Sequence, residues 1–298
     1  MSKSRSKILL AVDGSDQAFE ATRYASQFFS PDRIEVVLFH VTTEIPERFW
    51  DVEKHPTLIL KEATLRDWRD QQKKKIKELM ERARQLFLDR GVPEDRVRIK
   101  IQDRQVGIAR DIIHESQGNY NAVILGRWGM SLWTDFLWGS IAEKLIGSLT
   151  HLPLCVVGGT PQVGKLLVGL DTSEGAMRAV DYVGTIVDGA DWEVTLFHAI
   201  RTPDEDILQR TRESMESVFE EGCRRLEKAG LSPSQITTRL ATGVLSRAGA
   251  IIAEALKGGY GTIVVGRRGL SYVEEFSMGR VSNKIIHMAK ELAVWVVS

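Results

Sequence analysis

Several features are scarce in this chain, and each scarcity narrows what the protein can be. Its 298 residues include two cysteines, Cys155 and Cys223. They form neither a Cys-x-x-Cys pair nor part of a metal-ligand cluster. We therefore expect reduced thiols in a cytoplasmic protein.

The chain also lacks an excess of charge of either sign, and it lacks long apolar runs. Lys and Arg total 40, and so do Asp and Glu, so neither nucleic acid nor an anionic membrane is an expected partner. No apolar run reaches the roughly 18 residues that a membrane-spanning helix needs. The run near the N-terminus is too short for the core of a signal peptide, and no such segment is expected.

What the chain does contain is the same pattern twice. KILLAVDGSDQA at 7–18 returns as KLLVGLDTSEGA at 165–176, and GRWGMSLWTDFLWGS at 126–140 returns as GRRGLSYVEEFSMGR at 266–280. The repeat predicts two domains, half one at residues 1–160 and half two at residues 161–298, joined near the glycine-rich segment 158–164. The two motifs lie farther apart in half one, so extra residues are expected there, at 42–65.

Each half alternates short apolar runs with amphipathic stretches. The runs in half one are KILLAV, EVVLFHV, VRIKI, AVILG and LCVV. They are continuous rather than alternating, which is typical of parallel strands covered on both faces. Five strands alternating with four helices predict a doubly wound α/β domain in each half.

The glycines of the repeated motif indicate a ligand site. Ligands of doubly wound sheets bind beyond the carboxyl ends of the strands, and Gly126 ends an apolar run. Gly126 and Gly129 allow a tight turn and a close approach of the backbone to a ligand. Gly139 and Ser140 open the next helix, whose N-terminal N–H groups suit a phosphate. Isolated glycines would indicate ordinary turns, but the repeated spacing favours a phosphate cradle.

Other residues at the strand ends have two interpretations each. Asp13 is placed to accept a hydrogen bond from a ribose or adenine, or to help hold Mg²⁺; the alternative is that it only caps a helix. For His40 and His198, a structural role is favoured over metal binding, and no metal-binding residue is assigned. For Trp128, Trp133 and Trp138, packing is favoured over covering the nucleotide.

At these residues the chain resembles the universal stress protein family, whose nucleotide motif is G-x2-G-x9-G-(S/T). Gly126, Gly129, Gly139 and Ser140 match it, and ILLAVDGS resembles the family's first strand and turn. The resemblance covers both halves. It implies a five-stranded parallel sheet of order 3-2-1-4-5 in each half, which binds ATP with Mg²⁺. It also implies pairing through the last strands, 152–157 and 292–297, both between the halves and in a homodimer.

Half two departs from the family motif at one position, where Arg280 replaces Ser or Thr. We expect half two to bind ATP more weakly or not at all, although Arg267 and Arg268 add positive charge nearby. The alternative is a tighter anion site, with the guanidinium of Arg280 pairing with phosphate. The candidate nucleotide-binding residues are Ala11, Asp13, Val41, Gly126, Trp128, Gly129, Gly139, Ser140 and Ile141 in half one, and Asp171, Ala199, Gly266, Gly269, Gly279 and Arg280 in half two.

The sequence is compatible with three functions. The favoured one is an ATP-dependent regulator of a stress response, which acts on an unidentified protein partner and is not an enzyme. The second is a slow ATPase or self-phosphorylating enzyme with Ser140 as acceptor. No base or arginine finger for fast phosphoryl transfer is evident, and no Walker loop or dinucleotide fingerprint is present. The third is a scaffold with degenerate sites, against which the intact motif of half one argues.

Overall fold

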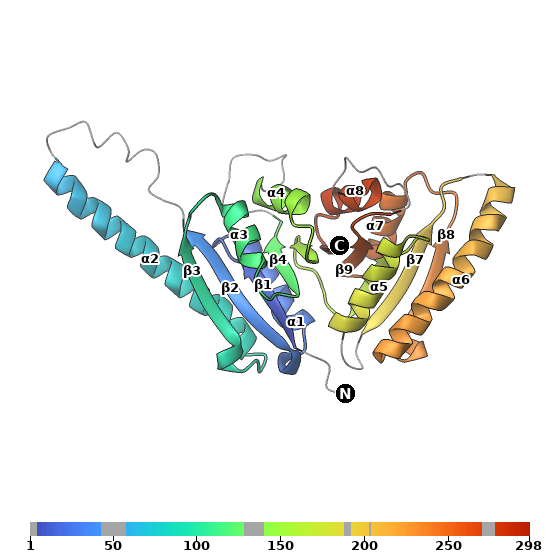
Figure 1. Ribbon diagram of the computed structural model, residues 1–298, viewed down its shortest axis with the longest axis horizontal. Helices are drawn as coiled ribbons and strands as arrows, with labels where there is room; N and C mark the ends of the chain where they lie inside the picture. The colour runs from blue at the N-terminus through green and yellow to red at the C-terminus, as the bar shows by residue number, and fades with distance from the viewer. Residues whose placement is uncertain (1–4, 43–57, 128–139, 188–191, 203, 270–277) are drawn as a thin grey trace.

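The two halves of the sequence form two copies of one α/β unit that lie side by side (Figure 1). The computed structural model describes residues 5–42, 58–127, 140–187, 192–202, 204–269 and 278–298. The elements of half one are β1 (Ser6–Ala11), α1 (Asp16–Phe28), β2 (Ile34–Thr42), α2 (Leu58–Leu88), β3 (Val97–Asp103), α3 (Ile108–Ser116), β4 (Ala122–Gly126), α4 (Ser140–Ser148) and β5 (Leu154–Val157). Those of half two are β6 (Lys165–Gly169), α5 (Glu174–Ile186), β7 (Glu193–Ala199), α6 (Glu205–Ala229), β8 (Ile236–Ala241), α7 (Arg247–Gly258), β9 (Thr262–Gly266), α8 (Arg280–Met288) and β10 (Ala293–Val297).

The described strands join into a single sheet of order β3-β2-β1-β4-β5-β10-β9-β6-β7-β8. Neighbouring strands within each half are parallel. Both halves therefore have the predicted order 3-2-1-4-5, and the predicted fold class is confirmed. The halves meet where β5 and β10 run antiparallel, with Val156 opposite Val294.

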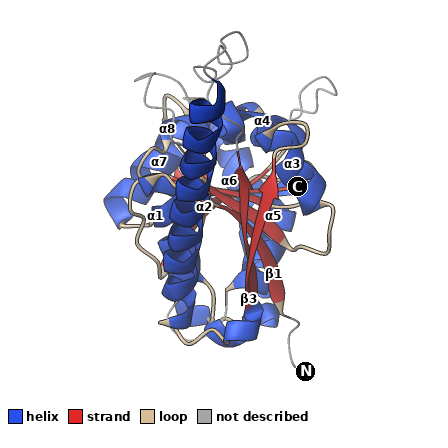
Figure 2. Ribbon diagram, turned by 90° about the vertical axis from the view of Figure 1, so that its left-hand side faces the viewer, coloured by secondary structure: helices blue, strands red, loops and turns tan. Residues whose placement is uncertain are grey.

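Helices cover both faces of this sheet, as Figure 2 shows. In β1, Ile8 and Leu10 point into one buried cluster, which includes residues of α1, α2, α5 and α6, while Leu9 points into the other. The second cluster includes residues of α3, α4, α7 and α8. Because each strand is buried on both faces, its sequence is a continuous apolar run rather than an alternating one. Both clusters extend through the two halves.

The ends of the helices follow from local residues. The Ser15 hydroxyl accepts a hydrogen bond from the Ala18 N–H at the start of α1, and Ser173 does the same for Ala176 at the start of α5. Such caps satisfy an N–H group that has no partner within the helix. Helix α6 ends at Gly230, whose φ of 110° is a left-handed conformation that glycine adopts readily.

The predicted extra segment of half one falls partly on the long second helix. Helix α2 has 31 residues and α6 has 25. Of residues 42–65, those from 58 onward belong to α2, and residues 43–57 lie outside the described part of the chain.

An aromatic cluster joins the halves beside the β5–β10 junction. The ring of Phe28 from α1 lies 4.9 Å from that of Trp192 and 5.7 Å from that of Trp295, measured between centroids. These contacts and the strand pairing confirm the predicted packing of the halves through their last strands. Within the chain, β5 lies between β4 and β10, and β10 lies between β5 and β9; the homodimer stays a prediction. Among the described helices, none is long and apolar enough to cross a membrane.

Candidate nucleotide site

The residues that the sequence singled out at strand ends lie at one edge of the sheet. Ala11, the last residue of β1, is in register with Phe39 of β2 and Leu125 of β4. Parallel pairing therefore brings Asp13, Val41 and Gly126 to the same carboxyl edge. In half two, Gly169 of β6 is in register with Phe197 and Val265, which places the equivalent residues, Asp171, Ala199 and Gly266, in the same way.

Asp13 and Asp171 organise the turn that follows the first strand of each half. Oδ1 of Asp13 accepts hydrogen bonds from the Ser15 N–H at 3.0 Å and from the Ser15 hydroxyl at 2.7 Å. Asp171 makes the same pair of bonds with Ser173. The helix cap is therefore the serine, and the carboxylate orients that cap, which corrects the alternative that Asp13 itself caps the helix.

The two histidines brace the backbone just before these aspartates. Nδ1 of His40 lies 2.6 Å from the Val12 carbonyl oxygen, and Nδ1 of His198 lies 2.6 Å from that of Leu170. A carbonyl only accepts hydrogen bonds, so Nδ1 carries a proton in both rings. Burial and the nearby charge of Arg247 lower the pKa of His198 below its usual value. Both histidines thus have the structural role that was favoured. The described residues contain no group of three or more His, Cys, Asp or Glu able to hold a metal ion.

The first glycine of each motif lies in close contact with a helix. A Cβ on Gly126 would lie 2.8 Å from the backbone carbon and oxygen of Gln17, and one on Gly266 would lie 2.4 Å from the carbonyl oxygen of Gly175. The first turn of α1 or α5 therefore occupies the space that a side chain at this position would need. These glycines let the strand end touch the helix that follows the turn of Asp13 or Asp171.

The second glycine of half two lies against the aspartate. A Cβ on Gly269 would lie 2.7 Å from Oδ2 of Asp171. The backbone of the glycine turn thus passes directly over the carboxylate, and any side chain there would crowd it. The matching glycine of half one, Gly129, lies outside the described residues, as do Trp128 and Gly139.

Helices α4 and α8 begin beside these turns. Gly279 is the N-cap of α8 and uses no side-chain cap, and its own N–H donates to the Arg267 carbonyl at 2.8 Å. Ser282 ties the first turn of α8 to the strand end through a 2.7 Å bond to the Gly266 carbonyl. Arg280 is exposed, and its side chain makes no hydrogen bond or ion pair with the described residues. In α4, the partly buried Ile141 side chain packs against the core.

The model of the universal stress protein family matches residues 4–157 and, a second time, residues 163–298. The chain belongs to the universal stress protein family. No curated protein sequence matches the chain significantly.

Solved structures share this universal stress fold in tandem. A universal stress protein from Archaeoglobus fulgidus DSM 4304 is 20% identical, with a TM-score of 0.67, over 98% of this chain and 98% of that one. A functionally unknown protein from Pseudomonas aeruginosa PAO1 is 15% identical, with a TM-score of 0.55, over 99% of this chain and 93% of that one. At these identities the likeness concerns the fold.

Sequence reasoning missed the role of two arginines in this universal stress protein. Arg127 and Arg267 each follow the first glycine of the motif, and both are buried. Arg267 was expected to add positive charge beside the half-two cradle, but its guanidinium binds carbonyl oxygens of half one instead. The available signal was the recurrence of arginine at this one position in both copies of the motif.

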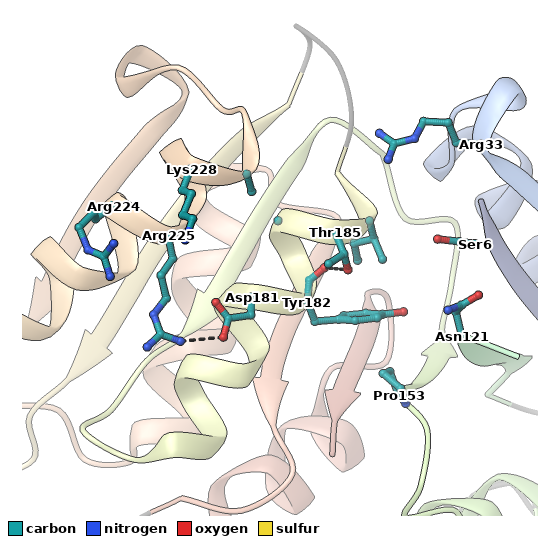
Figure 3. Close-up of a pocket in the computed structure, with 13 residues that line it drawn as sticks. Ser6, Arg33, Asn121, Pro153, Asp181, Tyr182, Thr185, Arg224, Arg225 and Lys228 are labelled. Atoms are coloured by element: carbon teal, nitrogen blue, oxygen red, sulfur yellow. Dashed lines mark hydrogen bonds and ion pairs between the residues drawn. The ribbon is translucent and has the colours of Figure 1, made fainter. Parts of the chain in front are cut away.

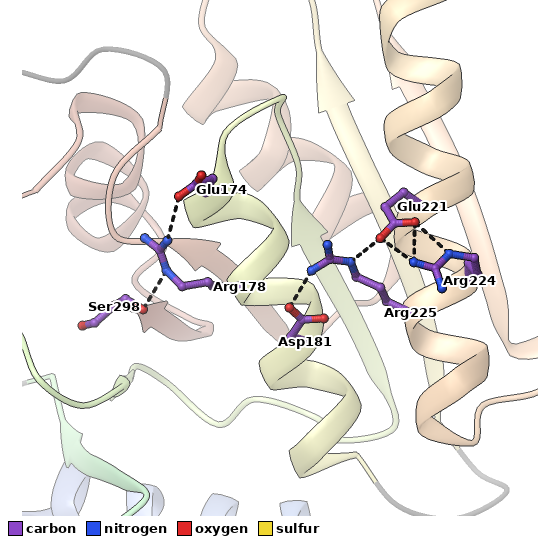
Figure 4. Close-up of polar contacts among 7 residues, drawn as sticks. All are labelled: Glu174, Arg178, Asp181, Glu221, Arg224, Arg225 and Ser298. Atoms are coloured by element: carbon purple, nitrogen blue, oxygen red, sulfur yellow. Dashed lines mark hydrogen bonds and ion pairs between the residues drawn. The ribbon is translucent and has the colours of Figure 1, made fainter.

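A pocket of about 910 Å³ lies between the halves at the opposite end of the sheet (Figure 3). Ser6, Asn121 and Pro153 line it from the starts of strands in half one, and Tyr182 and Lys228 line it from half two. Two of its arginines pair with carboxylates: Arg225 pairs with Asp181 and Glu221, and Arg224 pairs with Glu221 (Figure 4). This pocket is therefore separate from the candidate nucleotide site, which lies beyond the carboxyl ends of the strands.

Proposed function

We propose that this universal stress protein binds ATP in half one and acts as a nucleotide-dependent regulator of a stress response. The observation that carries the proposal is the complete spacing from Gly126 to Ser140 between the end of β4 and the start of α4. The first turn of a helix offers N–H groups without partners and a positive dipole end, both of which favour a phosphate. Membership of the family supports the same ligand.

The residues at the carboxyl edge of half one fit a nucleotide better than they fit a protein-bound metal. Asp13 provides one carboxylate, and the described part of the chain provides no cluster that would hold a cation without the phosphates. Mg²⁺ is commonly held by one or two carboxylates together with substrate phosphates. Under this proposal Mg²⁺ arrives with ATP, and Asp13 is the residue of this chain that would hold it or a ribose hydroxyl.

The regulatory part of the proposal rests on the small number of possible catalytic groups among the candidate residues of half one. Asp13 is the one carboxylate among the half-one candidates, and its Oδ1 is engaged by Ser15. A fast phosphoryl transfer enzyme needs a positioned base and charge stabilisation. We propose that ATP occupancy, rather than turnover, sets the conformation offered to a protein partner.

The binding proposal is tested by calorimetry on the full chain. Wild type should bind ATP with Mg²⁺, and Gly129→Val should abolish that binding because a branched side chain would fill the cradle. Gly147→Ala is the matched control, since a Cβ on Gly147 in α4 would meet nothing within 4 Å. Mass spectrometry of ligand retained through purification gives an independent answer. Unchanged ATP affinity in folded Gly129→Val would refute the assignment.

A further inference from the structure

Arg127 of half one reaches across the junction to half two. It directly follows Gly126, and its side chain is 1% exposed. Its guanidinium donates to the carbonyl oxygens of Ile286 and, at 2.7 Å, Ala289. These carbonyls lie at the C-terminal end of α8, the helix that begins at the half-two cradle.

Arg267 makes the mirror-image connection. It directly follows Gly266, is 5% exposed, and donates to the carbonyl oxygens of Ile146 and, at 2.9 Å, Leu149. These carbonyls lie at the C-terminal end of α4, the helix that begins at the half-one cradle. Helices α4 and α8 face each other on either side of the junction (Figure 1).

The chemistry of this contact suits arginine in particular. The last carbonyls of a helix have no partner within it and form the negative end of its dipole. A guanidinium places several donors in one rigid plane, so it can hold two such carbonyls at once, whereas an ammonium acts as a single compact charge. Burial lowers the pKa of Arg127 to about 10, which still leaves it charged at neutral pH.

We propose that Arg127 and Arg267 are positioning residues that couple the two cradles. Arg267 is anchored in the glycine turn of half two and holds the helix whose N-terminus serves half one; Arg127 does the reverse. An α-helix of nine residues moves as a short rod, so displacement of its C-terminal end displaces the N–H groups that face the phosphate. The geometry thus makes ATP affinity in half one depend on a residue of half two.

This inference rests on the proposed ATP site, so its test needs a second measurement that does not involve ATP. Amide hydrogen exchange supplies it, because exchange reports local opening of a helix end. Arg267→Lys should speed exchange at the end of α4, near Leu149, and leave α8 unchanged. Arg127→Lys should speed exchange at the end of α8, near Ala289, and leave α4 unchanged.

Calorimetry on the full chain then measures the effect on the nucleotide site. Arg267→Lys should weaken the half-one binding of ATP, the component lost in Gly129→Val, by at least about fivefold, the lower end of ordinary coupling between sites. Arg225→Lys is the matched control, because Arg225 is an arginine of half two whose ion-pair partners, Asp181 and Glu221, are also in half two. It should leave ATP affinity unchanged.

The outcomes distinguish a failure of the arginine coupling from a failure of the proposed ATP binding. If wild type binds ATP and Arg267→Lys binds it equally well, the coupling is wrong. If both variants loosen both helices alike, the arginines merely stabilise the junction and the inference is overturned. If wild type does not bind ATP, the proposed function fails, and a crossed exchange pattern would still support the positioning of each helix by the opposite half.

Discussion

Trp295 of β10 donates its indole N–H to the hydroxyl oxygen of Tyr24 in α1, at 3.1 Å, across the junction of the halves. The same hydroxyl lies 3.0 Å from Oγ1 of Thr262. Tyr182 of α5 is the repeat equivalent of Tyr24, but Cys155 stands where the equivalent of Trp295 would be. The Tyr182 hydroxyl is buried and has no hydrogen-bond partner among the described residues. The Tyr24–Trp295 hydrogen bond between the halves therefore has no repeat-related counterpart at Tyr182.

Removing the Tyr24 hydroxyl should lower the stability of the protein, whereas removing the equivalent hydroxyl of Tyr182 should not. Tyr24→Phe leaves the buried Trp295 N–H unpaired, so the free energy of unfolding should fall by about 1–3 kcal/mol. Tyr182→Phe removes a group with no partner, so it should change stability by less than about 0.5 kcal/mol or raise it. Urea denaturation of both variants measures the difference; equal losses would show that the hydrogen bond is unimportant.

The β5–β10 pairing should not tolerate a charge. Val156 is fully buried opposite Val294, so Val156→Lys buries an unpaired ammonium and should destabilise the chain by more than about 3 kcal/mol. Thr238→Lys, at an exposed position of the edge strand β8, is the control and should change stability by about 0.5 kcal/mol or less. Thermal denaturation compares them. Unaltered stability in Val156→Lys would mean that this strand is not the contact between the halves.

The packing role of Gly126 predicts opposite effects for two glycine substitutions. Gly126→Ala forces a Cβ against the backbone of Gln17 and should cost about 1–3 kcal/mol, as overpacking does. Gly147→Ala, in open space on α4, should stabilise the protein by about 0.4–1 kcal/mol. Both are measured by denaturant unfolding, and a neutral Gly126→Ala would contradict the close contact of β4 with α1.

The two cradles should differ in ATP affinity. Arg280 is exposed at the first position of α8, where its bulk replaces the small donor found at Ser140. Arg280→Ser should raise the affinity of half two for ATP. The affinity is measured by calorimetry on the full chain that also carries Gly129→Val, so that half one does not contribute to binding. The full chain is required because the halves share their sheet and cores. Loss of binding in Arg280→Ser would instead favour direct pairing of the guanidinium with phosphate.

Turnover should be very slow. Purified protein with ATP and Mg²⁺ should hydrolyse far less than the roughly 10 per second of a median enzyme. Labelled ATP followed in single turnover, with Ser140→Ala as the control for self-phosphorylation, distinguishes binding from chemistry. A rate near the enzyme median would overturn the view of this protein as a regulator.

The sequence could predict those features that depend on neighbours along the chain. Continuous apolar runs such as that of β4 indicated strands buried on both faces. Ser15 and Gly230 indicated helix ends, because one caps a helix by a local hydrogen bond and the other adopts a left-handed conformation. The strand order followed from the family resemblance, and the gathering of Asp13, Val41 and Gly126 at one edge followed from the parallel sheet.

What only the tertiary structure decided depends on contacts between residues far apart in sequence. The sequence did not show that α1 packs closely against Gly126, because glycine permits close approach of any group and does not specify which. Arg267 was assigned to the cradle of its own half, yet its long side chain reaches carbonyls of the other half. An exposed arginine beside a phosphate and a buried one at a helix end have the same sequence signature. The antiparallel pairing of β5 with β10 decides that Arg267 is the buried kind, because it brings the negative C-terminal end of α4 within reach of the guanidinium.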